Sequence, residues 1–204
     1  MLSPLSTNTP LKKFSLDCYY YRGQENHICL WLEAAKRCRV EEFHLNFHLD
    51  NNPLKPNIFI SQTLVVLKLE MLRIASDDTS CVHLPSLKTL HLDVVIFKNQ
   101  NDCINFLSAC PKLEHLHAKV MLELVRENTS SMDFMFDVVK NVQFLSIVCN
   151  PSNQQGSLKN IPVFQNIIHI ELMLRGCSSL CWDDVAELLR HCPKLQIIFI
   201  TKVC

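Results

Sequence analysis

One stretch near the middle of the chain, residues 84–92, reads Leu84-Pro85-Ser86-Leu87-Lys88-Thr89-Leu90-His91-Leu92. Its last six residues place apolar side chains at the first, fourth and sixth positions. The alternation at the end is typical of a β-strand that buries one face. The proline before it cannot continue a helix, so we expect the chain to leave a return segment here and enter a strand.

The same six-residue phrase recurs along almost the whole chain. It begins at residues 11, 40, 64, 87, 113, 142, 167 and 195, so successive phrases are 29, 24, 23, 26, 29, 25 and 28 residues apart. Leucine-rich repeats have periods of roughly 20–29 residues. Eight matches at this spacing predict strands near residues 11–16, 40–45, 64–69, 87–92, 113–118, 142–147, 167–172 and 195–200.

These strands predict an α/β fold, a leucine-rich-repeat solenoid with a parallel β-sheet on its concave face. Irregular helices or extended segments should cover the convex face. One strand and its return segment cannot bury their own apolar face, so stacked neighbours must bury it for each other. We expect residues 11–204 to form one domain of about eight repeats, preceded by a disordered or partly ordered N-terminus over residues 1–10.

The return segments should differ from repeat to repeat. Apolar residues at helical spacing predict helices over residues 28–38, 102–110 and 183–192, with a weaker pattern over residues 132–140. Two of these helices should bury, respectively, Ile28, Trp31, Leu32 and Ala35, and Val185, Leu188, Leu189 and Cys192.

Capping residues and prolines predict where the last helix begins and where two return segments are extended. Ser178, Ser179 and Asp183 are the candidate caps of the last helix. Pro53 and Pro56 suggest extended crossings in the two shortest repeats, where no helical pattern is present.

Composition argues against several classes of function. The 204 residues are 48% hydrophobic and include 20 basic and 20 acidic residues, so the chain can bury a sizeable core. The balanced charge argues against nucleic acid or a membrane as the main partner. Only 3 glycines occur, at Gly23, Gly156 and Gly176, and a phosphate-cradling loop needs glycines in a cluster.

The 11 cysteines raise the question of whether the chain lies in an oxidising or a reducing compartment. Residues 1–10 lack the basic start and apolar core of a secretory signal. No apolar run approaches the roughly 18 residues needed to span a bilayer. We therefore expect a cytoplasmic or nuclear protein, in which reduced cysteines behave as small buried hydrophobes.

The repeat phrases resemble the leucine-rich-repeat region of plant F-box proteins of the F-box/FBD/LRR type. They are Pro10-Leu11-Lys12-Lys13-Phe14-Ser15-Leu16, Gln62-Thr63-Leu64-Val65-Val66-Leu67-Lys68-Leu69, the phrase at residues 84–92, and residues 107–116. The resemblance covers about residues 10–203. It implies the substrate-recognition region of an adaptor of a cullin-RING ubiquitin ligase.

Two parts of that family's pattern do not accompany the repeats. We see no F-box, the segment that docks a Skp-type adaptor, ahead of Leu11, and no C-terminal FBD. We therefore expect either a fragment of such an adaptor or a free-standing leucine-rich-repeat scaffold or inhibitor that recruits no ligase. A Skp-type adaptor is an expected partner only if an upstream F-box exists.

Strand alternation predicts which side chains face a protein partner. Residues between and beside the buried positions should form three exposed columns on the concave face. Over the first five strands these residues are mostly charged or histidine, and they form the candidate protein-binding face: Lys13, Ser15, Asp17, Glu42, His44, Asn46, Lys68, Glu70, His91, Asp93, His115, His117 and Lys119.

The same columns become apolar over the last three strands. The candidate apolar contact patch there consists of Phe144, Val148, Met173, Ile197 and Phe199. An exposed apolar patch usually marks a contact site. We expect the patch either to pack against a C-terminal domain or to be covered by loops of the last repeats.

Cysteine and histidine chemistry is the main alternative to protein binding. The histidines of the concave face, with His169, are a conceivable pH-sensitive or metal-binding group. Cys177, Cys181, His191 and Cys192 come nearest to zinc-ligand spacing. Variable repeat positions tolerate histidine, however, and Cys192 repeats Cys110 and Cys38 as a core residue at a helix end. We therefore expect no catalytic residue, metal or cofactor, and we rank a hydrolase, a metal enzyme or a small-molecule receptor below a binding protein.

Overall fold

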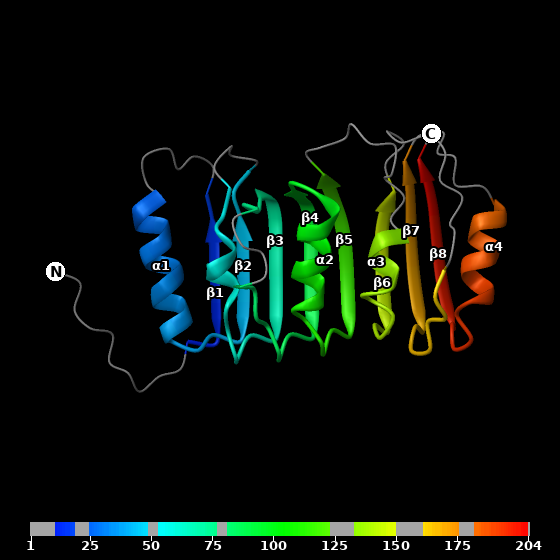
Figure 1. Cartoon of the computed structure of the whole chain (residues 1–204), viewed down its shortest axis with the longest axis horizontal. Coiled ribbons are helices and arrows are strands. Elements are labelled where there is room, and N and C mark those ends of the chain that lie inside the picture. The colour runs from blue at the N-terminus through cyan, green and yellow to red at the C-terminus, as the bar shows by residue number, and fades with distance from the viewer. Residues whose placement is uncertain are drawn as a thin grey trace.

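The computed structural model describes residues 11–18, 25–48, 53–76, 81–122, 133–149, 161–175 and 182–203. Its framework is one sheet of eight parallel strands in chain order, side by side from β1 to β8 (Figure 1). The predicted α/β leucine-rich-repeat fold is thereby confirmed. The strands are β1 (Lys13–Asp17), β2 (Glu42–Asn46), β3 (Val66–Arg73), β4 (Thr89–Phe97), β5 (His115–Leu122), β6 (Phe144–Cys149), β7 (His169–Arg175) and β8 (Ile197–Val203).

Two apolar ladders run across the sheet because every pair of strands keeps the same register. They are Phe14, Phe43, Leu67, Leu90, Leu116, Leu145, Ile170 and Ile198, and Leu16, Leu45, Leu69, Leu92, Ala118, Ile147, Leu172 and Ile200. From β2 to β7 each ladder residue is at most 4% exposed. The ladder residues of β1 and β8 are only partly buried, since each of these strands has a neighbour on one side.

A second set of contacts joins the repeats just before their strands begin. The carbonyl of Lys12 accepts hydrogen bonds from the N–H groups of Glu41 and Glu42, both at 2.9 Å. Equivalent carbonyls, each accepting two N–H groups of the following repeat at 2.7–3.2 Å, belong to Glu41, Val65, Lys88, Glu114, Gln143 and Ile168. These paired hydrogen bonds, which we call the seam, set the register at each of the seven junctions.

The lead-in prolines lie in tight turns that end the return segments. The N–H of Leu113 donates to the carbonyl of Cys110 at 3.1 Å, and the turns at residues 84–87 and 192–195 close in the same way. Proline is then the second residue of the turn, a position that its fixed φ favours. Residues 139–142 make the same turn without proline, so proline reinforces a turn that belongs to the repeat.

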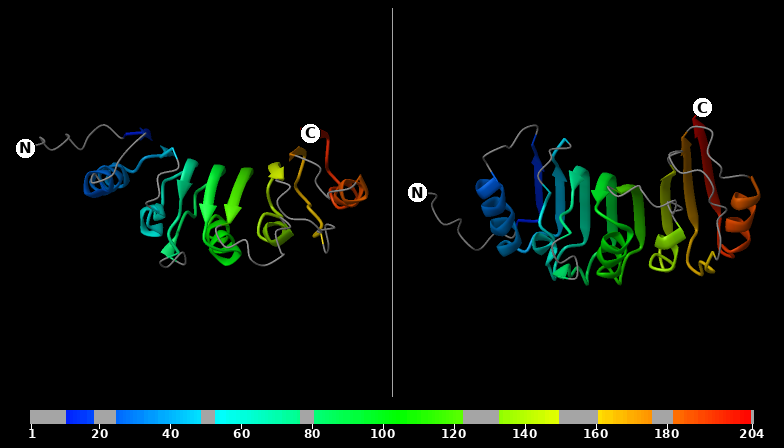
Figure 2. Two further views of the ribbon diagram at one scale, coloured as in Figure 1. Left: turned by 90° about the horizontal axis from the view of Figure 1, so that it is seen from above. Right: turned by 45° about the horizontal axis from the view of Figure 1, so that its top comes forward.

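The sheet is bent into a shallow arc, and the helices lie on its outer, convex side (Figure 2). Within the described ranges, the structure contains no helix long and apolar enough to cross a membrane. The rings of Phe59, Phe97 and Phe106 pack edge to face at 5.2 and 5.7 Å, which ties this layer to the sheet. The helices are α1 (Glu25–Arg37), the 3-10 helix η1 (Pro56–Phe59), α2 (Gln100–Ser108), α3 (Asp133–Phe136) and α4 (Trp182–Arg190).

Several local predictions were wrong. The helix predicted over residues 132–140 shrinks to the single turn of α3. The extended crossing expected at Pro56 is instead the start of η1, because proline fits the first turn of a helix, where its missing N–H costs nothing. Asp183 lies inside α4 and is not its cap, while Ser178 and Ser179 lie outside the described residues.

Two of the predicted core residues are exposed. Trp31 on α1 is 45% exposed and Leu189 on α4 is 37% exposed. Their helices lie at the two ends of the arc, where each has neighbouring repeats on one side only (Figure 1). The remaining predicted residues of both helices are buried, so the apolar faces are narrower than the sequence pattern indicates.

A β-bulge interrupts the alternation of β4 after Asp93, and the outward-facing columns end there. Val94 has no partner in β5, because the register shifts between Asp93 and Val95. Its φ is 56°, and Met71 at the equivalent place in β3 has φ 50°. This left-handed backbone is rare for a β-branched residue. The extra residue returns Val95 to the core, where it is 0% exposed.

Truncating a central ladder residue tests this core. We expect Leu92→Ala to lower the free energy of unfolding by about 2–5 kcal/mol, because the change leaves a cavity among fully buried neighbours. Leu30→Ala, at a side chain 63% exposed on α1, should change the free energy by no more than about 0.5 kcal/mol. Urea unfolding followed by circular dichroism measures both. Equal losses of unfolding free energy in the two variants would contradict the role of the ladder residues in the core.

Candidate functional site

The structure aligns the outward-pointing residues into columns. Column one is Lys13, Glu42, Val66, Thr89, His115, Phe144, His169 and Ile197; column two is Ser15, His44, Lys68, His91, His117, Ser146, Glu171 and Phe199. Column three aligns in two runs, Asp17, Asn46, Glu70, Asp93 and Lys119, then Val148, Met173 and Thr201. The ladder residues are buried on the side of the sheet that the helices cover (Figure 2), so by strand alternation the three columns point to the inner side of the arc. We call this side the concave face.

The candidate residues differ in how far they reach the surface. All thirteen polar candidates are exposed or partly exposed. In the candidate apolar patch, Ile197 is 46% and Phe199 57% exposed, while Phe144 and Met173 are partly exposed. The side chain of Val148 lies outside the described part. The concave face therefore presents polar side chains over β1–β5 and large apolar ones towards β8.

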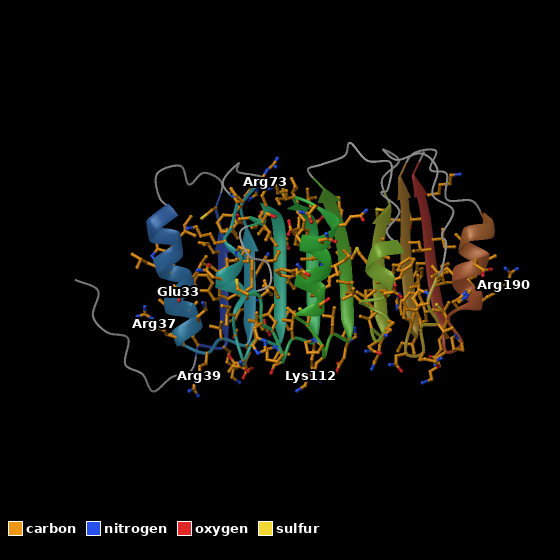
Figure 3. All side chains as sticks on the ribbon, viewed as in Figure 1. Glu33, Arg37, Arg39, Arg73, Lys112 and Arg190 are labelled. Atoms are coloured by element: carbon orange, nitrogen blue, oxygen red, sulfur yellow. The ribbon has the colours of Figure 1, made fainter. Side chains whose placement is uncertain are left out.

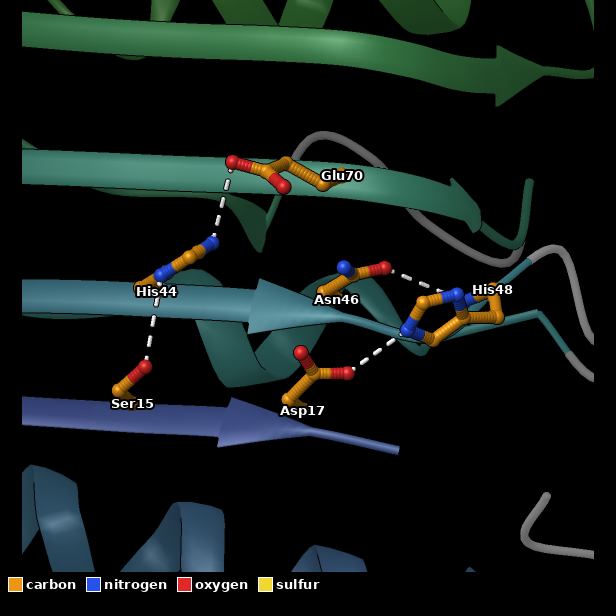
Figure 4. Close-up of polar contacts among 6 residues, drawn as sticks. All are labelled: Ser15, Asp17, His44, Asn46, His48 and Glu70. Atoms are coloured by element: carbon orange, nitrogen blue, oxygen red, sulfur yellow. Dashed lines mark hydrogen bonds and ion pairs between the residues drawn. The ribbon is translucent and has the colours of Figure 1, made fainter. Parts of the chain in front are cut away.

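Imidazole–carboxylate contacts cross the first three strands (Figure 4). His44 lies between two neighbours, with Nδ1 3.4 Å from Ser15 Oγ and Nε2 3.1 Å from Glu70 Oε1. His44 Nε2 makes no hydrogen bond, so its contact with Glu70 is one of proximity alone. His48 Nε2 lies 2.8 Å from Asp17 Oδ1 in a hydrogen bond.

His48 is a member of this face that the sequence did not indicate. Its backbone is left-handed, with φ 49°, and its N–H donates to Asn46 Oδ1 at 3.2 Å. The turn brings the ring back over Asp17 (Figure 4). An Asn side chain two residues before the turn is the only local signal, and such turns are too common for it to single out one histidine.

Lysines neutralise two other carboxylates of the face. Lys13 Nζ lies 3.7 Å from Glu42 Oε2, and Lys119 Nζ lies 3.2 Å from Asp93 Oδ1. Lys68 forms no ion pair with a carboxylate of the described residues. Of the arginines labelled in Figure 3, Arg37 and Arg190 lie on the helices α1 and α4, and Arg73 lies near the C-terminal end of β3. Solvent-exposed pairs of this kind contribute about 0–1 kcal/mol each.

Two histidines stack in the middle of the concave face. The ring centroids of His91 and His117 are 4.2 Å apart with an interplanar angle of 13°, and His117 Nδ1 is hydrogen-bonded to Ser146 Oγ at 2.9 Å. Burial lowers the pKa of both imidazoles. The neighbouring His117 lowers the pKa of His91 further, and nearby carboxylates oppose these shifts in part.

Four aromatic rings follow one another across the last four strands. Centroids are separated by 6.1 Å between His115 and Phe144, 4.6 Å between Phe144 and His169, and 5.5 Å between His169 and Phe199. We call this row the ring ladder. Glu171 lies beside it, with Oε1 3.3 Å from His169 Nε2. The sequence placed these residues in columns but did not indicate that their rings touch.

Three of the described cysteines, Cys103, Cys110 and Cys192, are buried and behave as packing residues. Burial raises the pKa of Cys110 to about 12 and that of Cys192 to about 11, so both thiols stay protonated at neutral pH. A nucleophilic cysteine needs the opposite shift. Cys38, predicted to be buried in the same way, is only partly buried.

The four residues with zinc-ligand spacing in the sequence do not form a cluster within the described part of the chain. Cys177 and Cys181 lie outside the described residues. His191 Nδ1 is hydrogen-bonded to the carbonyl of Glu187 at 2.8 Å. Within the described ranges, no three His, Cys, Asp or Glu side chains are placed to hold a metal ion.

A hollow on the convex side is too small to suggest a small-molecule receptor. It lies between the end of α2 and the turn after α3 and has a volume of about 150 Å³. Its lining includes Leu107, Pro111, Val139 and Asn141, which offer no group for acid–base chemistry. Pockets for drug-sized ligands usually enclose roughly 300–1,000 Å³.

Comparison with known proteins agrees with the repeat geometry. Residues 86–111 match the family model described as the leucine-rich repeat. Among curated proteins of Arabidopsis thaliana, one named as an F-box protein is 40% identical over 185 residues, covering 90% of this chain and 36% of the relative. An F-box/LRR-repeat protein is 30% identical over 173 residues, covering 82% and 31%. One named as an FBD-associated F-box protein is 35% identical over 113 residues, covering 52% and 26%.

The parallel ladder and the matched repeat define a leucine-rich-repeat protein, a class built for protein interaction. More specifically, the chain is related to the F-box/LRR-repeat proteins of plants, as the repeat phrases implied. The chain spans 26–36% of the length of the three relatives.

The stacked histidines predict how stability depends on pH. Their folded pKa values lie below 6.5, the usual value of a histidine, so the unfolded chain binds more protons near that pH. Their contribution to stability is therefore present above about pH 6.5 and is lost as the pH falls through the lowered folded values.

His117→Gln tests this dependence, because glutamine keeps a hydrogen-bonding group near Ser146 and removes the titration. Between pH 7.5 and 5.5, the free energy of unfolding from urea titrations should fall less for His117→Gln than for the wild type. His83→Gln, at an exposed position, should follow the wild type. If the free energy of unfolding of His117→Gln fell as much as that of the wild type, the stacked pair would not be the cause of the pH dependence.

Proposed function

We propose that this chain recognises a segment of a partner protein across the concave face, as the substrate-recognition part of a ubiquitin-ligase adaptor. The observation that supports this most is the contrast between the two sides of one sheet. Inward positions repeat the same apolar ladders, while the outward columns vary in charge, size and polarity from strand to strand. Mechanistically, binding relies on shape and charge complementarity, with no bond made or broken.

The dimensions of the concave face suit an extended peptide segment. Eight strands spaced about 4.8 Å apart make a face roughly 34 Å wide. An extended chain covers that width with about ten residues. The charged pairs over β1–β5 supply polar contacts, and Ile197 and Phe199 supply apolar area that a partner would bury.

The ligase part of the proposal rests on the relatives. Their names refer to an F-box, and an F-box docks a Skp-type adaptor in the family that the repeats resemble. We place the function in the cytoplasm or nucleus. Free thiols at Cys103, Cys110 and Cys192, among others, are consistent with a reducing compartment.

A comparison of surface variants tests the binding face. Proximity labelling in plant cells should enrich at least one protein with the wild-type chain and with a convex variant carrying Leu30→Ala, Arg37→Ala and Leu189→Ala. A concave variant carrying Ser15→Arg, Thr89→Arg and His115→Arg places large cationic side chains at exposed or partly exposed positions and should bind the purified partner about tenfold more weakly. Equal binding by the two variants would contradict the concave face as the binding site.

A reconstituted reaction tests the ligase role separately. The partner should be ubiquitinated when the chain is joined to an F-box and supplied with a Skp-type adaptor, cullin and RING protein. The concave variant in the same fusion should leave it unmodified. A partner that binds the concave face and stays unmodified with the wild-type fusion would contradict the adaptor role and favour a scaffold or inhibitor.

A further inference from the structure

The C-terminal half of the concave face combines aromatic rings with an accessible carboxylate. Phe199 and Glu171 are register partners in column two, on β8 and β7. Phe199 is 57% exposed, and the side chain of Glu171 is 41% exposed. Behind them, the rings of His169 and Phe144 continue the ring ladder across the sheet. One group of a partner could therefore lie on the Phe199 ring and contact the Glu171 carboxylate at the same time.

The charge of the three columns favours a cation. They contain five carboxylates, Asp17, Glu42, Glu70, Asp93 and Glu171, against three lysines, so with neutral histidine their formal charge is 3 − 5 = −2. Among the described residues, lysines pair with two of these carboxylates, Glu42 and Asp93. The other three contact histidines, at 2.8–3.3 Å. No lysine or arginine whose side chain the structure describes is within ion-pair distance of Glu171.

We propose that the concave face binds a basic segment of its protein partner, with an arginine laid on Phe199 and paired to Glu171. This inference rests on the proposed function and names the partner's chemistry. A guanidinium is planar, stacks on aromatic rings and meets a carboxylate with two parallel N–H donors. A lysine ammonium is a point charge that pairs with Glu171 but gains less from the ring.

The position of β8 explains part of the exposure of Phe199, because this strand has a neighbour on one side only. The ring nonetheless stands in column two and contacts His169 on the concave side, at 5.5 Å between centroids. Covering the free edge of β8 with another strand would not neutralise Glu171. The carboxylate is the feature that distinguishes a cationic partner from an apolar one.

Peptide binding to the full chain tests the inference. The probes are fluorescent glycine–serine peptides carrying arginine, lysine or glutamate at alternate positions, measured by anisotropy at low and high salt. The arginine peptide should bind about two- to five-fold more tightly than the lysine peptide, as expected for one exposed cation–π contact. The glutamate peptide should not bind, and high salt should weaken the two basic peptides.

Single substitutions separate the ring from the charge. Phe199→Ala should reduce arginine-peptide affinity about two- to five-fold and change lysine-peptide affinity little. Glu171→Gln should weaken both basic peptides about threefold, whereas Lys68→Gln should strengthen both about twofold by removing a repelling charge. A gain in affinity cannot come from misfolding. Trp31→Ala, at a ring 45% exposed on α1, and Glu41→Gln, at an exposed carboxylate, are the matched controls and should change neither affinity.

Three outcomes would overturn the inference. The first is equal binding of the arginine and lysine peptides with no effect of Phe199→Ala. The second is preference for the glutamate peptide. The third is self-association that Phe199→Ala abolishes in sedimentation experiments, because a second copy of the chain would then occupy the ring.

The inference and the proposed function fail in different ways. A partner that depends on the concave face but contacts it without a basic segment defeats this inference and leaves the proposed function intact. Basic peptides that bind as described, with no protein partner dependent on the concave face, defeat the proposed function.

Discussion

The fold depends on burial that no repeat achieves alone. A single strand with its return segment would leave its two ladder residues in water, and only neighbours on both sides reduce their exposure to 4% or less. The seam makes that burial cooperative: each carbonyl at a strand's start, such as that of Val65 or Lys88, accepts two N–H groups of the next repeat and sets its register. A slip of one residue would turn the ladders towards solvent. β1 and β8, with one neighbour each, show the cost in their partly exposed ladder residues.

The same constraint separates stability from recognition. Because alternation sends the ladder residues inward, the residues between them are free to differ without loss of the core. Along column two the chain uses this freedom to place a lysine, two stacked histidines, a buried serine, a carboxylate and a phenylalanine on successive strands. The bulge at Val94 ends this alternation and returns the chain to the core. Side chains that change from polar to apolar along a rigid, repetitive sheet suit a protein-binding surface.

The repeat phrases alone predict the parallel sheet, because the apolar spacing and the period are both properties of the sequence. They also predict the register, since equivalent positions must align for the ladders to stack. The failures lie where tertiary surroundings override a local pattern: α3 is cut to one turn, and Trp31 and Leu189 are exposed at the ends of the arc. Within the candidate site, contacts such as those of His48 with Asp17 depend on one backbone turn, and the touching rings of the ring ladder depend on side-chain rotamers. The sequence pattern contains neither.

We propose that a protein partner contacts the variable columns of this parallel sheet and not the helical side. Site-specific photo-crosslinking is the most direct measurement. A photoreactive phenylalanine analogue replaces Thr89 in the middle of column one, or Leu30 on the convex helix α1. The partner should crosslink through position 89 and not through position 30. Crosslinking through position 30 alone would place the partner on the helices and contradict the claim.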